Sequence, residues 1–177
     1  MTETETIKWS VRTTLEKRKG DINQCKTPEE RIEWLKTTRP YEIKILKGNC
    51  LLNEGLDLLF SLATGQGGVS FSNSTAQMGV GNSNVAAART QTDLQGSSTS
   101  WKGQEVGYPT TPGENVGLTG RCTKFKSSWG ASDGNFNWEE WSIRNSSGAN
   151  LNLNRKVEYM GTKSGGTWTL EVEVSLT

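Results

Sequence analysis

Two adjacent glutamates, Glu139 and Glu140, are the residues of this chain whose type and spacing come closest to catalytic chemistry. Paired carboxyl groups act as acid and base in glycoside hydrolysis when they face each other across the scissile bond. Neighbouring residues of a β-strand point to opposite faces of the sheet, so these two side chains are not expected to share one substrate. A solvated position or a β-bulge is the favoured interpretation of the pair.

Other catalytic and metal-binding arrangements lack the residues that they need. The chain contains no histidine, so no nucleophile can be paired with a histidine base. Three cysteines without CxxC spacing are too few for a four-ligand zinc site. The aspartates and cysteines are scattered along the chain, at Asp21, Asp57, Asp93, Asp133, Cys25, Cys50 and Cys122. The sequence therefore predicts a protein that is not an enzyme and that holds no metal or cofactor.

The glycine-rich stretch GVGNSNVA, residues 79–86, invites comparison with a phosphate-binding loop. It lacks both the lysine followed by a hydroxyl residue and the strand–loop–helix context of such a site. An ordered loop over Gly81–Gly96 is favoured instead, because Thr90, Thr92 and Asp93 can each bond to nearby backbone and fix an irregular path.

Seven tryptophans raise the possibility of a carbohydrate-binding module, since exposed rings stack on sugars. Four of them fall in the apolar phase of predicted strands and are expected in the core: Trp9, Trp138, Trp141 and Trp168. Trp101 and Trp129 lie beside glycines and serines, so these two rings are the candidate exposed platforms.

The elements that must position these residues are mainly strands. Alternating apolar and polar residues predict strands over 7–14, 41–47, 78–80, 101–108, 116–125, 136–143, 151–159 and 168–176. A phase slip within 136–143 predicts a β-bulge at Glu139–Glu140, and the glycines of 161–166 predict a hairpin connection. The expected fold is mainly β, an antiparallel β-sandwich or barrel-like domain over 9–177.

Two helices and an arm complete the expected fold. One central apolar helix over Asn49–Ala63, capped by Asn49 and ended by Gly65, is expected to cover one open end of the sheets. A short helix over Pro28–Lys36, inside an inserted segment at 21–38, begins with a Thr27–Glu30 capping box. Residues 1–8 are polar and are expected to form an arm that becomes ordered only on assembly.

The charge and hydropathy of the chain exclude several classes of partner. A net charge of +1 gives no overall field for nucleic acid, and no apolar run reaches transmembrane length. The first residues lack the basic and apolar regions of a secretory signal, so synthesis in the cytoplasm is expected. The odd cysteine count then favours reduced, mostly buried thiols, with a disulfide between subunits as the minority alternative.

Five stretches occur in a distinctive order: NCLLNEGLDLLFSLATG, MGVGNSNVAAARTQTDLQG, FNWEEWSIRN, LNR and MGTKSGGTWTLEVEVSL. This order resembles a group of tailed-bacteriophage virion proteins, described as minor structural, head-decoration or tail-fibre-like. The likeness covers roughly Trp9 to Leu176, with Asp21–Thr38 as an extra insertion. It implies a non-enzymatic component of the particle.

We therefore expect a capsid decoration (cement) protein that binds the major capsid protein on the outer surface of the virion. A homo-oligomer, with a trimer favoured, would multiply weak contacts through avidity. A tail, collar or fibre component is the alternative, and a carbohydrate-binding module is less favoured. The expected interface residues are Ile32, Trp34 and Leu35 of the insertion, Arg89 and Asp93 of the loop, and Trp101 and Trp129.

Overall fold

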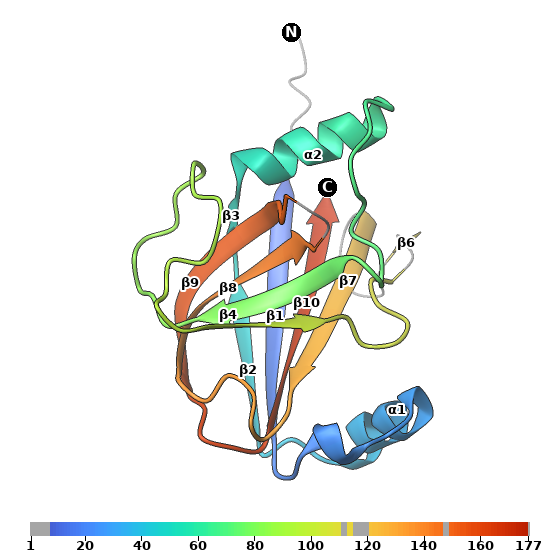
Figure 1. Ribbon diagram of the computed structural model, residues 1–177, viewed down its shortest axis with the longest axis vertical. Helices are drawn as coiled ribbons and strands as arrows, with labels where there is room; N and C mark the ends of the chain where they lie inside the picture. Colours follow the sequence, from blue (N-terminus) through green and yellow to red (C-terminus); the bar gives the residue numbers. More distant parts are fainter. Residues whose placement is uncertain (1–7, 111–112, 115–120, 147–148, 177) are drawn as a thin grey trace, which may run out of the picture.

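The computed structural model describes residues 8–110, 113–114, 121–146 and 149–176. Two antiparallel sheets pack face to face as a β-sandwich that does not close into a barrel (Figure 1). The mainly β prediction is therefore confirmed in its sandwich form. Residues 1–7 of the predicted arm lie outside the described residues.

The first sheet has the strand order β2-β1-β10-β7-β6. Its strands are β2 (Glu42–Lys47), β1 (Trp9–Arg18), β10 (Thr167–Leu176), β7 (Arg121–Trp129) and β6 (Gly113–Glu114). The first and last long strands of the chain thus pair in the middle of the sheet, with Trp9 opposite Leu176. The regular alternation predicted for the last strand is explained by this central position.

The second sheet has the order β3-β9-β8-β4-β5. Its strands are β3 (Cys50–Leu51), β9 (Asn152–Thr162), β8 (Asn137–Asn145), β4 (Ala76–Gly81) and β5 (Thr99–Gly103). The register of β8 against β9 shifts between Trp138 and Glu140, which confirms the predicted bulge. The shift keeps both Trp138 and Trp141 on the core side, where each is fully buried.

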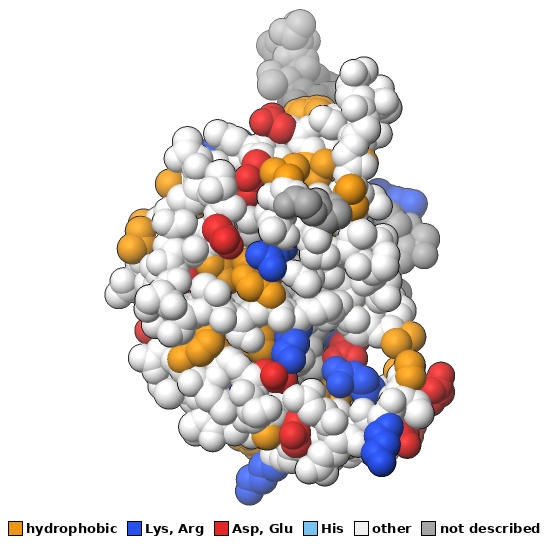
Figure 2. All heavy atoms as spheres, viewed as in Figure 1, with side chains coloured by type: hydrophobic (Ala, Val, Ile, Leu, Met, Phe, Trp, Pro, Cys, Tyr) orange, Lys and Arg blue, Asp and Glu red, His pale blue; other side chains and the backbone are white. Residues whose placement is uncertain are grey.

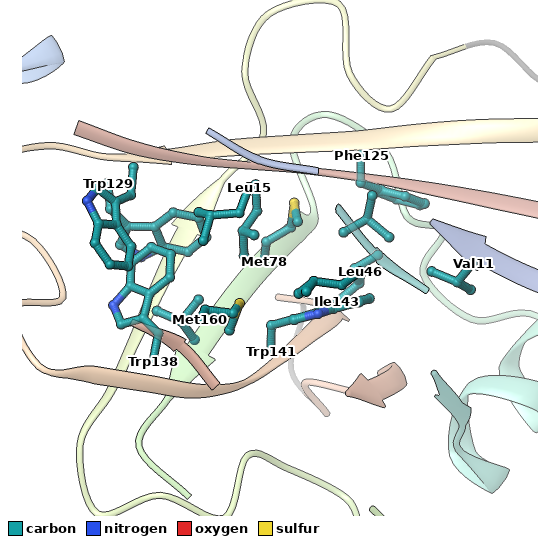
Figure 3. Packing of buried hydrophobic residues seen from close by; sticks show 14 of the residues in the cluster. Val11, Leu15, Leu46, Met78, Phe125, Trp129, Trp138, Trp141, Ile143 and Met160 are labelled. Atoms are coloured by element: carbon teal, nitrogen blue, oxygen red, sulfur yellow. The ribbon is translucent and has the colours of Figure 1, made fainter. Parts of the chain in front are cut away.

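The core fills the space between the two sheets (Figure 3). Three rings form an edge-to-face stack: Trp138 lies 5.0 Å from Trp129 and 4.9 Å from Trp168, measured between ring centroids. Leu15 of the first sheet and Met78 of the second extend toward each other in the middle of the core. The stack of three tryptophan rings joins the two sheets at the end away from α2.

The apolar helix is α2 (Asn53–Ala63), and it lies across one end of the sandwich, as predicted (Figure 1). Its predicted start at Asn49 is wrong, because Cys50 and Leu51 pair with β9 and the N-cap is Leu52. Gly55 is required by packing: a Cβ there would lie 2.5 Å from the carbonyl oxygen of Leu153. The glycine that weakens the isolated helix therefore lets it approach β9 closely.

The inserted segment contains the short 3-10 helix η1 (Ile22–Gln24) and α1 (Pro28–Thr37), at the opposite end of the sandwich from α2 (Figure 1). The predicted capping box is present in full: the Thr27 hydroxyl accepts from the Glu30 N–H and the Glu30 carboxylate accepts from the Thr27 N–H. At the other end of α1, the Arg18 guanidinium donates to the carbonyl of Thr38. The helix is thereby held on its own domain.

Several strand boundaries differ from the sequence prediction. The predicted strand 101–108 ends at Gly103 in β5, because the chain turns at 106–107, where Gly107 has a positive φ of 83°. The predicted strand 116–125 is described only from Arg121, since 115–120 lie outside the described residues. β1 continues to Arg18, four residues beyond its predicted end.

Candidate interaction surfaces

The residues predicted for an interface do not converge on one site. Ile32, Trp34 and Leu35 lie on α1, and the segment with Arg89 and Asp93 leaves the sandwich near the α2 end and the edge of β9 (Figure 1). The side chains of Ile32, Trp34 and Leu35 are half-buried, and Trp34 lies over Gly20, whose missing Cβ would be 3.4 Å from the ring. Trp34 therefore packs in part on its own domain, and its role in an interface stays a prediction.

The prediction that Trp129 is an exposed platform is wrong. Its side chain is fully buried and stacks edge to face on Trp138. Trp129 lies on the core-facing side of β7, in the same phase as Phe125. Its serine neighbours Ser127 and Ser128 belong to β7, and Gly130 begins the turn that follows, so these neighbours do not mark an exposed loop.

Trp101 lies on the outer face of the second sheet, but its ring already contacts Gly79 and Arg144. A Cβ at Gly79 would lie 2.5 Å from the ring, so the glycine lets the indole lie against β4. The Arg144 guanidinium lies 3.8 Å from the ring centroid and donates two hydrogen bonds to Gln77. A sugar would have to displace this cation–π contact.

The long segment 82–98 has no helix or strand, as predicted for this loop. It is held by Glu140, which is fully buried on the outer face of the second sheet. The Glu140 carboxylate accepts hydrogen bonds from the backbone N–H groups of Gln95 (3.0 and 3.1 Å) and Gly96 (2.7 Å). Gly81 makes room beneath it, since a Cβ there would lie 2.4 Å from Glu140 Oε1.

Arg155 completes this anchor, which we call the Glu140–Arg155 clamp. Arg155 Nε donates to Glu140 Oε2 at 2.6 Å, and both side chains have no exposed surface. Arg155 Nη1 also donates to Gln91 Oε1 at 2.9 Å. A buried ion pair is a weak source of net stability, but it fixes one geometry because either charge alone would be costly. The clamp therefore holds 82–98 in one path over the sheet.

The clamp holds the loop without using the side chains of its predicted contact residues, Arg89 and Asp93. The side chains of Arg89 and Asp93 are exposed, and Val85 is 55% exposed. Backbone bonds secure the segment around them: Asn53 N–H donates to the Arg89 carbonyl, and Asn152 Nδ2 donates to the Thr92 carbonyl. A rigid loop thus displays one apolar and two charged side chains.

The sequence reasoning found the bulge at Glu139–Glu140 but missed what it does. The bulge at Glu140 is confirmed, but its side chain is not solvated, because it is fully buried and accepts hydrogen bonds from the loop. The expected separation of the pair is consistent with the structure, since Glu139 is half-buried and only Glu140 is fully enclosed. No local signal separates Arg155 from its neighbours, because Lys156 and Glu158 are also charged residues of β9.

The outer face of the first sheet carries paired charges. Lys124 Nζ lies 3.2 Å from Glu173 Oε2, and Lys126 Nζ lies 3.2 Å from Glu171 Oε2. The Tyr108 hydroxyl donates to Glu171, and burial together with that carboxylate raises the pKa of the phenol. The face visible in Figure 2 also mixes both signs of charge. Neither face offers the one-signed field that attracts nucleic acid.

A buried lysine lies near the α1 end. Lys163 is 1% exposed, and its ammonium donates to the Gly130 carbonyl and to Asn135 Oδ1. Burial lowers its pKa to about 8. Nearby, burial disfavours the Asp133 carboxylate, but hydrogen bonds from Lys102 and Asn23 prevail and lower the pKa of Asp133. Asp133 joins η1 to the turn after β7 through Asn23, and Lys163 joins the connection between β9 and β10 to the same turn.

Lys163 gives the protein an alkaline pH dependence. Its lowered pKa means that the unfolded chain binds more protons than the folded chain between about pH 8 and pH 10.5, so this group adds stability as pH rises through that window. Between pH 8 and pH 10.5, the unfolding free energy of the natural chain should rise by about 3 kcal/mol relative to that of Lys163→Met. Urea denaturation at each pH measures this difference, with Lys36→Met as the control. A flat difference would contradict the assignment.

An apolar cavity of about 670 Å³ opens between the sheets beneath α2. Its apolar walls come from both sheets, from α2 and from the loop before β4, and include Trp9, Leu59, Leu62, Phe71, Phe125 and Leu153. This volume is typical of small-molecule sites. Pro109, Thr110 and Arg121 also line the cavity, and no ligand is assigned to it.

Among the described residues there is no disulfide, no group of metal ligands and no helix that could cross a membrane. Cys25 and Cys50 are half-buried free thiols and Cys122 is a buried one. Within the described ranges, no three cysteine, aspartate or glutamate side chains gather as metal ligands. Neither α1 nor α2 has the length and hydropathy needed to cross a membrane.

Comparisons of this chain with protein-family models, curated proteins and solved structures found no significant match. The geometry of the surfaces and the order of the sequence stretches therefore carry the functional argument.

Proposed function

We propose that this protein is a non-enzymatic structural component of a tailed-phage virion, and specifically a capsid decoration protein. The observation that carries the proposal is the Glu140–Arg155 clamp, which immobilises a surface loop while leaving Val85, Arg89 and Asp93 exposed. A loop held in its bound shape loses little conformational entropy on binding, so preorganisation raises affinity for a fixed partner.

A loop of fixed shape suits a protein surface of complementary shape. We propose that this surface belongs to the major capsid protein, on the outside of the assembled shell. Val85 offers an apolar contact and the two exposed charges set orientation. Binding to the assembled state alone would stabilise the shell by about 2.7 kcal/mol per site at a hundredfold excess over Kd. Repeated over many sites, that contribution resists heat and osmotic shock.

Addition of the purified chain to shells that lack it tests the proposal. We expect bound copies on the shell surface by cryo-electron microscopy and a raised melting temperature of the shell. The double reversal Arg89→Glu with Asp93→Lys should reduce occupancy, because both side chains are exposed and the clamp is left intact. Lys19→Glu, an exposed charge in the turn after β1, is the matched control.

A tail, collar or fibre component is the second candidate, since the ordered sequence stretches resemble those proteins as well. Labelling of the chain on particles separates the two. Signal confined to tails, with shells left unbound, would replace the decoration proposal by the tail proposal. The carbohydrate-binding alternative is not favoured, because Trp101 is covered by Arg144 and Trp129 is buried.

A further inference from the structure

The edge strand β2 presents a second surface, independent of the loop. β2 pairs with β1 and forms the outer edge of the first sheet. Ile43 and Ile45 lie on β2 and Tyr41 comes just before it, and these three alternating side chains are exposed: Tyr41 at 58%, Ile43 at 56% and Ile45 at 50%. Single exposed apolar residues are ordinary, but a row of three on an open strand edge is a template for pairing.

The backbone groups of β2 alternate between β1 and the free edge, whereas the N–H of Tyr41, just before the strand, donates to the Lys17 carbonyl of β1. Gly48 N–H donates to the Val11 carbonyl, and Val11 lies opposite Gly48 in the continued register of β1 and β2. Because hydrogen-bonding direction alternates along an antiparallel strand, residues 42, 44 and 46 face β1. Ile43 and Ile45 therefore direct their N–H and C=O groups to the free edge.

We propose that β2 pairs with β2 of a second copy of this chain, antiparallel and two-fold symmetric about Ile43. In that register Ile43 lies opposite Ile43, and Tyr41 lies opposite Ile45. On the other face, Glu42 lies opposite Lys44, so opposite charges meet on each side of the axis. The first sheet of one copy would then continue, through the paired β2 strands, into the first sheet of the other copy.

The charges select this partner and this register. Lysines on an edge strand normally discourage pairing, and Lys44 also donates to the Tyr159 carbonyl across the edge of the sandwich. A register centred on Lys44 would place two lysines opposite each other, which is unfavourable. Only the register centred on Ile43 puts Glu42 against Lys44. The Glu42 carboxylate, which pairs with Lys17 of its own chain at 2.8 Å, would then lie between two lysines. The trimer expected from the sequence stays a prediction, since this contact is two-fold.

Cysteine cross-linking tests the register. The chain carrying Ile43→Cys should form a disulfide-linked dimer on mild oxidation, because opposed residues on paired strands have Cα atoms about 5.5 Å apart. Ile45→Cys is the matched control: its own copy would lie four residues away, about 13 Å along the strand. The unsubstituted chain measures the background from its own thiols. Equal cross-linking of the two variants, or none from Ile43→Cys, would overturn the proposal.

Charge reversal tests the pairing without a disulfide. By sedimentation over a concentration series, Glu42→Lys and Lys44→Glu should each weaken dimerisation roughly tenfold, and the double reversal should restore it. Each variant's melting temperature, taken at a concentration where it is monomeric, shows that its fold is intact. Failure of the double reversal to recover association would contradict the register. The measurement needs no shell, so its outcome does not depend on the decoration proposal.

Discussion

Replacing Glu140 with glutamine is expected to lower the free energy of unfolding by about 3–5 kcal/mol, because the change leaves Arg155 charged, buried and without its counter-ion. The amide has one acceptor oxygen where the carboxylate has two. Its NH₂ group must therefore face either Arg155 Nε or the N–H groups of Gln95 and Gly96, which are all donors. Urea denaturation followed by circular dichroism measures the loss.

Glu139→Gln is the matched control, since it makes the same change one residue away on a half-buried side chain. Its effect should stay within about 0.5 kcal/mol, as for most surface substitutions. Hydrogen exchange adds a local measurement: the amides of Gln95 and Gly96 should lose protection in Glu140→Gln and keep it in Glu139→Gln. Similar losses in both variants would show that the clamp does not hold the loop.

The same substitution links stability to function. If the clamp preorganises 82–98, Glu140→Gln should weaken shell binding even under conditions where the sandwich remains folded, because the loop would pay ordering entropy on binding. The β2 edge lies on the other sheet and is untouched by the change. Self-association through β2 should therefore persist in this variant, which separates the two surfaces in one experiment.

Local signals in the sequence were sufficient for the elements that depend on near neighbours. The capping box of Thr27 and Glu30 fixed the start of α1 to the residue, because both partners lie within one turn. The phase slip around Glu139–Glu140 located the bulge, since inward residues must keep facing the core. The strict alternation of the last strand likewise predicted its docking in the sheet.

The features that sequence reasoning missed depend on contacts between distant residues. Asn49 is a good N-cap by type, but the two residues after it pair with β9 about 100 residues later, and this pairing delays α2 to Asn53. The clamp likewise joins Glu140 to Arg155 and to amides 44 and 45 residues before it. No local pattern distinguishes such residues from solvated ones. The burial of Trp129 depends in the same way on rings from two other strands.

Truncation of Trp138 to alanine is the second change with a large expected effect, about 3–5 kcal/mol of unfolding free energy. The ring bridges the two sheets between Trp129 and Trp168, and its Nε1 donates to the Gly134 carbonyl at 2.8 Å. Its loss leaves a cavity that close packing cannot refill and removes both edge-to-face contacts. Trp101→Ala makes the same truncation on the outer face, where solvent takes the vacated space, and should cost clearly less. Chemical denaturation followed by far-ultraviolet circular dichroism compares the two variants without relying on tryptophan fluorescence. Equal costs at the two positions would mean that the stacked rings are not the feature that holds the sheets together.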